Sequence, residues 1–134
     1  GEISEFGVLP VGLFNLMAAE LEKIDNIRVL EQPLYSVELG VAGTVDAIAE
    51  YNSSLACLDF KTASRIRTKE DIANYFLQCT FYSKAWEEMT GEKIEKIVII
   101  MASEDGHSEV FEEKPSNYTK QLESMVEKYH NGTL

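Results

Sequence analysis

The chain has 134 residues, 45% of them apolar and 26% charged, which is typical of one globular domain with a core of its own. No apolar run approaches the roughly 20 residues that span a bilayer, and no signal peptide opens the chain, so we expect a cytoplasmic protein without a membrane anchor. The net charge of −11 argues against nucleic-acid binding, because phosphate recognition normally requires a basic surface.

The first predicted element is a helix over residues 10–24. Pro10 suits a first helical turn, and apolar residues then recur at helical spacing. The pattern of residues 28–39 predicts an extended segment, in which Pro33 marks an edge strand or an irregularity.

Residues 43–48 and 58–62 follow as two strands of a hairpin. A two-residue loop at positions 52–53 places Tyr51 opposite Ser54 and so fixes the register of the pair. One face of this hairpin is then apolar, which suits burial. The apolar pairs on that face are Val45 with Phe60, Ala47 with Leu58, and Ala49 with Ala56.

The same register groups three charged side chains. Asp46 lies opposite Asp59, and Lys61 stands beside Asp59 on the same face of the strand. Like charges directly opposed across two strands are unfavourable, so this grouping indicates a cation, a metal ion, between the two acids. The alternative is an ordinary amphipathic hairpin whose acids are solvated.

A long helix is predicted next, after a polar loop over residues 63–68. Thr68 and Asp71 make a capping-box-like start, and the helix runs to about Met89, before a Thr-Gly stop. Its predicted buried stripe consists of Ile72, Tyr75, Phe76, Cys79, Tyr82, Trp86 and Met89.

The remaining elements complete a mixed sheet. Residues 96–102 are a continuous apolar run, which predicts a strand covered on both faces, and residues 107–112 predict a short edge strand. A final helix is expected over residues 115–130. Its predicted inward residues are Tyr118, Leu122, Met125 and Tyr129. The order is α-β-β-β-α-β-β-α, in one domain spanning residues 1–134.

The cysteines and the basic residues each have an ordinary explanation. Cys57 and Cys79 are too few and too far apart for a zinc or iron–sulfur site, which favours buried free thiols in a reducing compartment. A basic cluster follows the second hairpin strand, and a solvated loop would explain it equally well. Its members are Lys61, Arg65, Arg67 and Lys69.

Four spaced elements of the chain together resemble the PD-(D/E)XK nucleases, in particular the RecB-like branch. They are Glu31, Gly43-x-x-Asp46, Asp59-x-Lys61-Thr62 and Gln78-x-x-x-Tyr82. Within that branch, residues 29–102 look like the mitochondrial genome maintenance exonucleases and related phage exonucleases. The resemblance implies an α/β (α+β) restriction-endonuclease-like core, a central mixed sheet of about five strands flanked by helices.

The resemblance also implies a role for each motif residue. Asp46 and Asp59 would ligate a divalent ion, with the Phe60 carbonyl as a further ligand, and Glu31 would complete the acidic cluster. Lys61 would orient or help deprotonate the attacking water, or stabilise charge at the phosphorus. Carboxylate ligands without thiolates favour Mg²⁺ or Mn²⁺.

Other residues would position active-site groups or contact DNA: Gln78, Tyr82, Thr62, Arg65, Arg67 and Lys69. Two assignments stay open from the sequence. Glu38 competes with Glu31 as the acid preceding Gly43, and core packing is a full alternative for Tyr82.

The resulting hypothesis is a metal-dependent DNA exonuclease of phage or mobile-element type, acting preferentially on single-stranded or free ends. Relatives carry an upstream helical region, so either such a segment precedes this chain or the chain is a minimal version. The alternatives are a non-catalytic acidic interaction module on the same fold and a structure-specific endonuclease.

Overall fold

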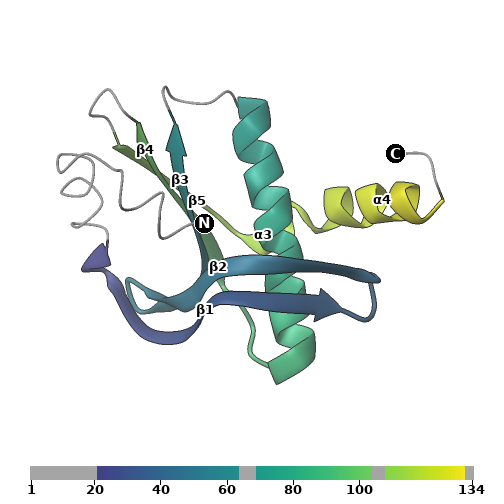
Figure 1. Ribbon diagram of the computed structural model, residues 1–134, viewed down its shortest axis with the longest axis horizontal. Coiled ribbons are helices and arrows are strands. Elements are labelled where there is room, and N and C mark those ends of the chain that lie inside the picture. Colours follow the sequence, from purple (N-terminus) through teal and green to yellow (C-terminus); the bar gives the residue numbers. More distant parts are fainter. Residues whose placement is uncertain (1–20, 64–68, 104–107, 132–134) are drawn as a thin grey trace.

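The computed structural model of the chain describes residues 21–63, 69–103 and 108–131. Five strands, two α-helices and a 3₁₀ turn lie in these ranges (Figure 1). In chain order they are β1 (Ile24–Ser36), β2 (Val41–Tyr51), β3 (Ser54–Ala63), α3 (Lys69–Thr90), β4 (Lys96–Ser103), β5 (Ser108–Glu113), η1 (Pro115–Asn117) and α4 (Thr119–His130).

The five strands form one mixed sheet in the order β1-β2-β3-β4-β5. Neighbouring strands are antiparallel except β3 and β4, which are parallel and joined through α3. The predicted five-stranded α+β fold is thereby confirmed, with the observed order β-β-β-α-β-β-α. Pro33 lies in an edge strand, where its missing N–H costs no ladder hydrogen bond.

The start of β1 corrects the predicted first helix. Most of residues 10–24 lie outside the described residues, but Ile24 opens β1 opposite Tyr51 instead of ending a helix. The backbone N–H of Asn52 donates to the Lys23 carbonyl at 3.0 Å, which extends this strand pairing by one further contact. Strand pairing therefore begins where the sequence pattern still favours a helix.

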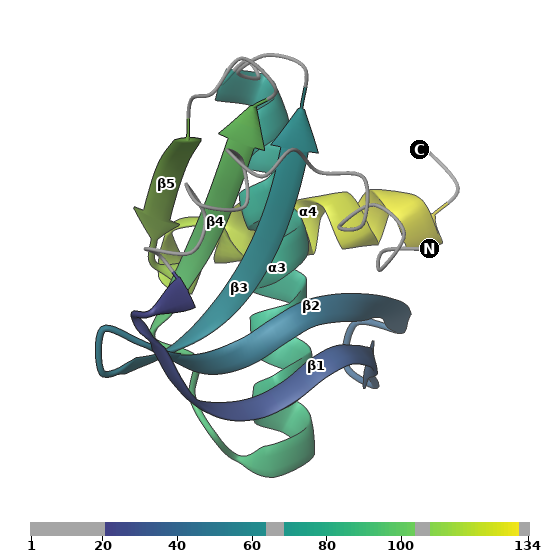
Figure 2. The same ribbon diagram turned by 60° about the vertical axis from the view of Figure 1, so that its left-hand side comes forward.

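Both described helices lie on the same side of the sheet (Figure 2). α3 packs directly on the strands and α4 packs against α3. β4 is buried on both faces, as predicted, because residues 97–102 divide between the core facing α3 and the core on the opposite face. No helix within the described ranges is long and apolar enough to cross a membrane.

α3 is buried around much of its circumference over residues 79–86. Most of the predicted stripe is buried, with Tyr75 half-buried, but Met89 is 54% exposed and was wrongly included. Phe81 and Ala85 are also buried, because the β1–β2 hairpin and α4 flank the helix beyond the sheet. The buried stripe is therefore wider than the one predicted.

The predicted inward face of the last helix is confirmed at its start and wrong toward its end. Leu122 is buried and Tyr118 stacks on Phe76 with ring centroids 5.5 Å apart, but Met125 is 39% and Tyr129 62% exposed. Val126 packs on the core instead. Contacts at positions 118, 122 and 126 follow a spacing of four, which lets the short helix lie along α3.

The turn between β1 and β2 is fastened to α3. Glu88 accepts hydrogen bonds from the Ser36 hydroxyl at 2.6 Å and from the Val37 N–H at 3.0 Å. At the other side of the turn, the His130 ring lies 2.6 Å from the Leu39 carbonyl oxygen. These contacts fix the far end of the hairpin on the helical layer.

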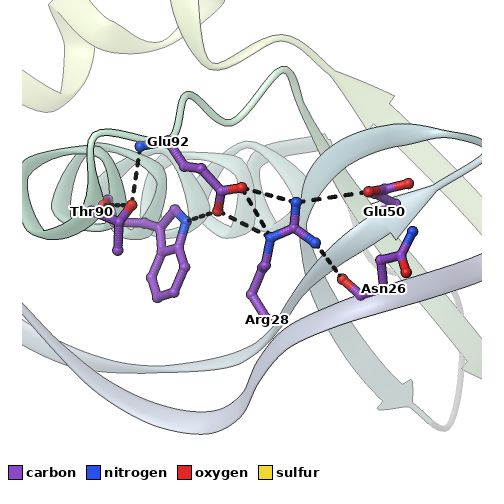
Figure 3. Close-up of polar contacts among 6 residues, drawn as sticks. Asn26, Arg28, Glu50, Thr90 and Glu92 are labelled. Carbon is purple, nitrogen blue, oxygen red and sulfur yellow. Dashed lines mark hydrogen bonds and ion pairs between the residues drawn. The ribbon is translucent and has the colours of Figure 1, made fainter.

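A second polar cluster ties β1 to the end of α3 (Figure 3). The Arg28 guanidinium binds both carboxylate oxygens of Glu92, with the shortest distance 2.8 Å, and reaches Glu50 at 3.7 Å. Glu92 also accepts the indole N–H of Trp86 at 3.1 Å. Together, the Glu88 and Arg28 contacts hold β1 and β2 against α3, and β2 carries Asp46.

Candidate active site

A two-residue hairpin sets the register of the candidate site. Asn52 and Ser53 have φ of 49° and 69°, which suits a type I′ loop, and Tyr51 pairs with Ser54 as predicted. The ladder between β2 and β3 runs to the pair Ala47 and Leu58 and ends there. Beyond that pair β2 stays with β1 and turns away from β3, so the two strands fork (Figure 2).

The alternation of β2 is interrupted at the fork. Val45 packs in the core facing α3 together with Ile48, whereas Ala47 lies in the core on the opposite face. The prediction that Val45 shares a face with Ala47 is therefore wrong. The partner strand is irregular at the same level, since Glu31 lies between the paired residues Leu30 and Gln32 and has a φ of 45°.

Asp46 lies where β2 separates from β3, and its side chain makes a hydrogen bond to the β3 backbone. Its Oδ2 accepts a hydrogen bond from the backbone N–H of Phe60 at 2.9 Å. Beyond the last β2–β3 pair, a side-chain oxygen thus satisfies a β3 donor that no longer faces a β2 carbonyl. The half-buried carboxylate is fixed beside β3.

Asp59 is the buried acid of the site. It is 5% exposed, and its Oδ2 has no hydrogen-bond partner, although the Lys61 Nζ lies 3.2 Å away as an ion pair. Burial, together with the hydrogen bond that its carboxyl shares with Asp46, raises the pKa of Asp59 to about 7. The positive charge of Lys61 only partly offsets these effects.

Lys61 lies between the acids and α3. Burial is the largest single influence and lowers its pKa, but the interactions with Asp59, Asp46 and Tyr75 together outweigh burial, so the pKa of Lys61 lies above its ordinary value. On its other side, the ammonium stands over the ring of Tyr75, 4.7 Å from the centroid. The Lys61 ammonium is thus positioned at the edge of the acidic pair by contacts with Asp59 and Tyr75.

α3 closes the site through Tyr82, which approaches β2 at Gly43. A Cβ atom at Gly43 would lie 3.0 Å from Tyr82 Cε1, so only glycine allows the helix to come this close without a shift. Burial raises the pKa of the Tyr82 phenol, which keeps it neutral. Tyr82 is both a core residue and a neighbour of the acidic pair.

The two cysteines are buried free thiols, as predicted. A hydrogen bond between them, together with burial, raises the pKa of the Cys79 thiol well above its ordinary value.

The structure brings some predicted residues together and leaves others apart. Asp46, Asp59 and Lys61 are neighbours, whereas Glu31 is exposed on the edge strand. Among the described residues, no group of three or more His, Cys, Asp or Glu side chains could hold a metal ion. The ligand role of Glu31 therefore rests on the sequence resemblance alone.

The predicted DNA-contacting residues lie mainly at the surface or outside the described part. Gln78 and Thr62 are exposed, near Cys79 and Lys61 along the chain. Arg65, Arg67 and the side chain of Lys69 lie outside the described residues. Sequence reasoning placed Tyr75 in the core stripe and missed its contact with Lys61, although its position seven residues before Tyr82 puts both on one helix face.

The donor set fits a hard divalent cation. Two carboxylates meet at one point, and one of them has a buried oxygen that lacks a hydrogen bond. An oxygen of this kind is costly unless a proton or a cation compensates it. Oxygen ligands of this type suit Mg²⁺ or Mn²⁺.

No protein-family profile matches the chain. The chain is 29% identical over 87 residues to an ATP-dependent helicase/nuclease subunit of Clostridium kluyveri, in two strains. The match covers 64% of this chain and 7% of the relative, so the chain spans under a tenth of these curated relatives.

A solved structure shares the fold. The crystal structure of a "Putative exonuclease" from Eubacterium rectale superimposes with a TM-score of 0.55 at 15% identity. The superposition covers 87% of this chain and 49% of that one. The chain thus has the fold of that structure and distant sequence similarity to a helicase/nuclease subunit.

Proposed function

We propose that this chain is a metal-dependent nuclease domain that hydrolyses DNA from free ends and binds Mg²⁺ or Mn²⁺ between Asp46 and Asp59. The observation that carries the proposal is the buried Asp59 oxygen without a hydrogen bond, beside a second carboxylate and a lysine. The fold shared with a "Putative exonuclease" and the similarity to a helicase/nuclease subunit support it.

Asp46 and Asp59 hold the cation, and the Phe60 carbonyl and Glu31 are further proposed ligands. A bound divalent ion neutralises charge on a phosphodiester and makes water a better nucleophile. Lys61 places an ammonium at the edge of the pair, where it orients the attacking water or stabilises negative charge at the phosphorus. Asp46 is itself oriented by the Phe60 N–H.

The proposed path of the DNA strand follows the end of β3 and the start of α3. Thr62 is exposed near the end of β3 and Gln78 is exposed near the middle of α3, and Arg65, Arg67 and Lys69 are proposed phosphate contacts. For single-stranded DNA, each phosphate contact should make the slope of the logarithm of the binding constant against the logarithm of the salt concentration steeper by about 0.7. Bound cations offset part of the net charge of −11 at the site.

The proposal is tested with an end-labelled linear oligonucleotide and a matching circle, with Mg²⁺, Mn²⁺ or a chelator. We expect divalent-ion-dependent shortening of the linear substrate and an intact circle. Asp59→Asn and Lys61→Met should each lower the rate about 100-fold or more, because the first removes a proposed ligand of the cation and the second removes the ammonium beside the reacting phosphate.

Exposed residues of α4 provide matched controls. Glu123→Gln and Lys120→Met make the same changes of charge away from the site and should keep the wild-type rate. Cleavage of the circle would indicate an endonuclease. Absence of any divalent-ion-dependent cleavage by the wild type would favour an acidic interaction module on this fold.

A further inference from the structure

The Lys61 ammonium makes an ion pair and a cation–π contact. Its Nζ lies 3.2 Å from Asp59 Oδ2 and 4.7 Å from the centroid of the Tyr75 ring. The first contact comes from the same strand, and the second comes from α3 across the core. Of the lysine–ring contacts in the described residues this one is the shortest, since Lys23 and Lys96 lie 5.8 Å and 5.1 Å from the Tyr51 ring.

We propose that Tyr75 is a positioning residue, whose ring face holds the Lys61 ammonium at the acidic pair when Asp59 is occupied by its ligand. The inference rests on the proposed function, and it adds a residue that none of the four sequence elements contains. Tyr75 acts through Lys61 and needs no contact with substrate.

The ion pair alone cannot hold Lys61 during the proposed reaction. A cation bound at Asp59 competes for the same oxygen and repels the ammonium. A lysine side chain has about 2 kcal/mol of rotamer entropy, so an unheld ammonium leaves the site readily. The ring face is not a ligand for the cation, and its attraction for the ammonium persists.

The surroundings of Tyr75 make the ring a firm support. Tyr75 is half-buried and packs on the core that includes Cys79 and Ile72 of the same helix. Lys61 is itself partly shielded, with 30% of its side chain exposed. Removal from water strengthens a cation–ring contact, so this pair should exceed one on an open surface.

The contact is tested first in metal-free protein by a double-mutant cycle of unfolding with Tyr75→Leu, Lys61→Met and both together. We expect the two changes to be non-additive by about two- to thirtyfold in the folding equilibrium constant. Tyr35→Leu, an exposed ring on β1, combined with Lys61→Met should be additive. Additive effects for Tyr75 would overturn the inference whatever the activity.

The functional part is tested by separating kcat from KM. Tyr75→Leu should lower kcat about tenfold with little change in KM for DNA, and Tyr75→Phe should retain the wild-type kcat because it keeps the ring. In the Lys61→Met background, Tyr75→Leu should cause no further loss. An equal loss in Tyr75→Phe, or a further loss in that background, contradicts the inference.

The two proposals fail in different ways. A wild-type protein without nuclease activity overturns the proposed function and with it the positioning role, while the unfolding cycle still decides whether the ring holds Lys61. An active wild type with an unimpaired Tyr75→Leu variant overturns only the inference.

Discussion

At the scale of single residues, Asp59 combines burial, a neighbouring acid and an oxygen without a hydrogen bond. Each of these conditions disfavours the ionised carboxylate, and Lys61 compensates only in part. A protein that needed only a stable core could place an apolar residue here. The arrangement is instead suited to receive a cation, which would exchange with the proton on Asp59.

The raised pKa of Asp59 makes a pH prediction for the metal-free protein. Its pKa is about 7 when folded and near 3.8 when unfolded, so its stabilising contribution is complete below about pH 4 and is lost as the pH rises to about 7. Compared with Asp59→Asn, the wild type should lose about 3 kcal/mol of unfolding free energy between about pH 5 and about pH 8.

Urea unfolding of the two proteins at several pH values measures this difference. Other carboxylates titrate in both proteins, so only the difference between the wild type and Asp59→Asn isolates Asp59. If the stability of the wild type relative to Asp59→Asn stayed constant or rose with pH, it would contradict the assignment of Asp59 as a carboxyl protonated below neutral pH.

Much of the site could be predicted at this scale, because hairpin register is a local property. The pairing of Tyr51 with Ser54 predicts that Asp46, Asp59 and Lys61 lie near one another, although the ladder ends one pair before Asp46, which reaches β3 through its side chain instead. The reversal of faces at Val45 was not predictable by counting, since it depends on the fork of β2 from β3. The contact between Lys61 and the Tyr75 ring depends on how α3 packs on the sheet, and a local sequence pattern does not predict that packing.

At the scale of elements, the β1–β2 hairpin is the part that the remaining fold must hold in place. Its far part separates from β3 at the fork and is held on α3 by Glu88 at the turn. Asp46 lies at the fork, next to the last pair of the β2–β3 ladder. The hydrogen bonds of Glu88 are therefore part of what keeps the candidate site in shape.

Glu88→Ala should destabilise the protein by about 1–2 kcal/mol, because the Ser36 hydroxyl and the Val37 N–H both lose a charged acceptor. Glu88→Gln should cost less, since its carbonyl still accepts. Chemical unfolding gives both values, with Glu87→Ala on the exposed side of the same helix as the control. Equal stability of Glu88→Ala and the control would show that the turn is not held by this residue.

The elements themselves were largely predictable, and their faces less so. Periodicity located α3 and the apolar run of β4, but Met89 and Met125 were assigned to cores from which both are turned away. Met89 lies in the last turn of α3, where residues 87–90 are all exposed, and Met125 lies beside Val126, which packs on the core in its place. An apolar stripe in the sequence predicts roughly which side of a helix faces inward. Which of two adjacent residues on that side is buried depends on the elements that the helix packs against.

At the scale of the whole molecule, the chain has a mixed sheet with one helical layer in the described residues (Figures 1 and 2). It spans 7% of the helicase/nuclease subunits it resembles and 49% of the structural neighbour. With the proposed function, we expect DNA to bind mainly through local contacts beside the acidic pair, because the overall charge of −11 repels a polyanion.

The most direct test of the central claim is the binding of Mn²⁺ to Asp46 and Asp59, measured as ligand-linked stabilisation. At a hundredfold excess over its dissociation constant, Mn²⁺ should stabilise the wild type by about 2.7 kcal/mol. Asp46→Asn and Asp59→Asn should lose this gain, while Lys61→Met should keep or increase it, because a competing positive charge is gone. A wild type that Mn²⁺ does not stabilise, or an Asp46→Asn variant stabilised equally, would contradict the account.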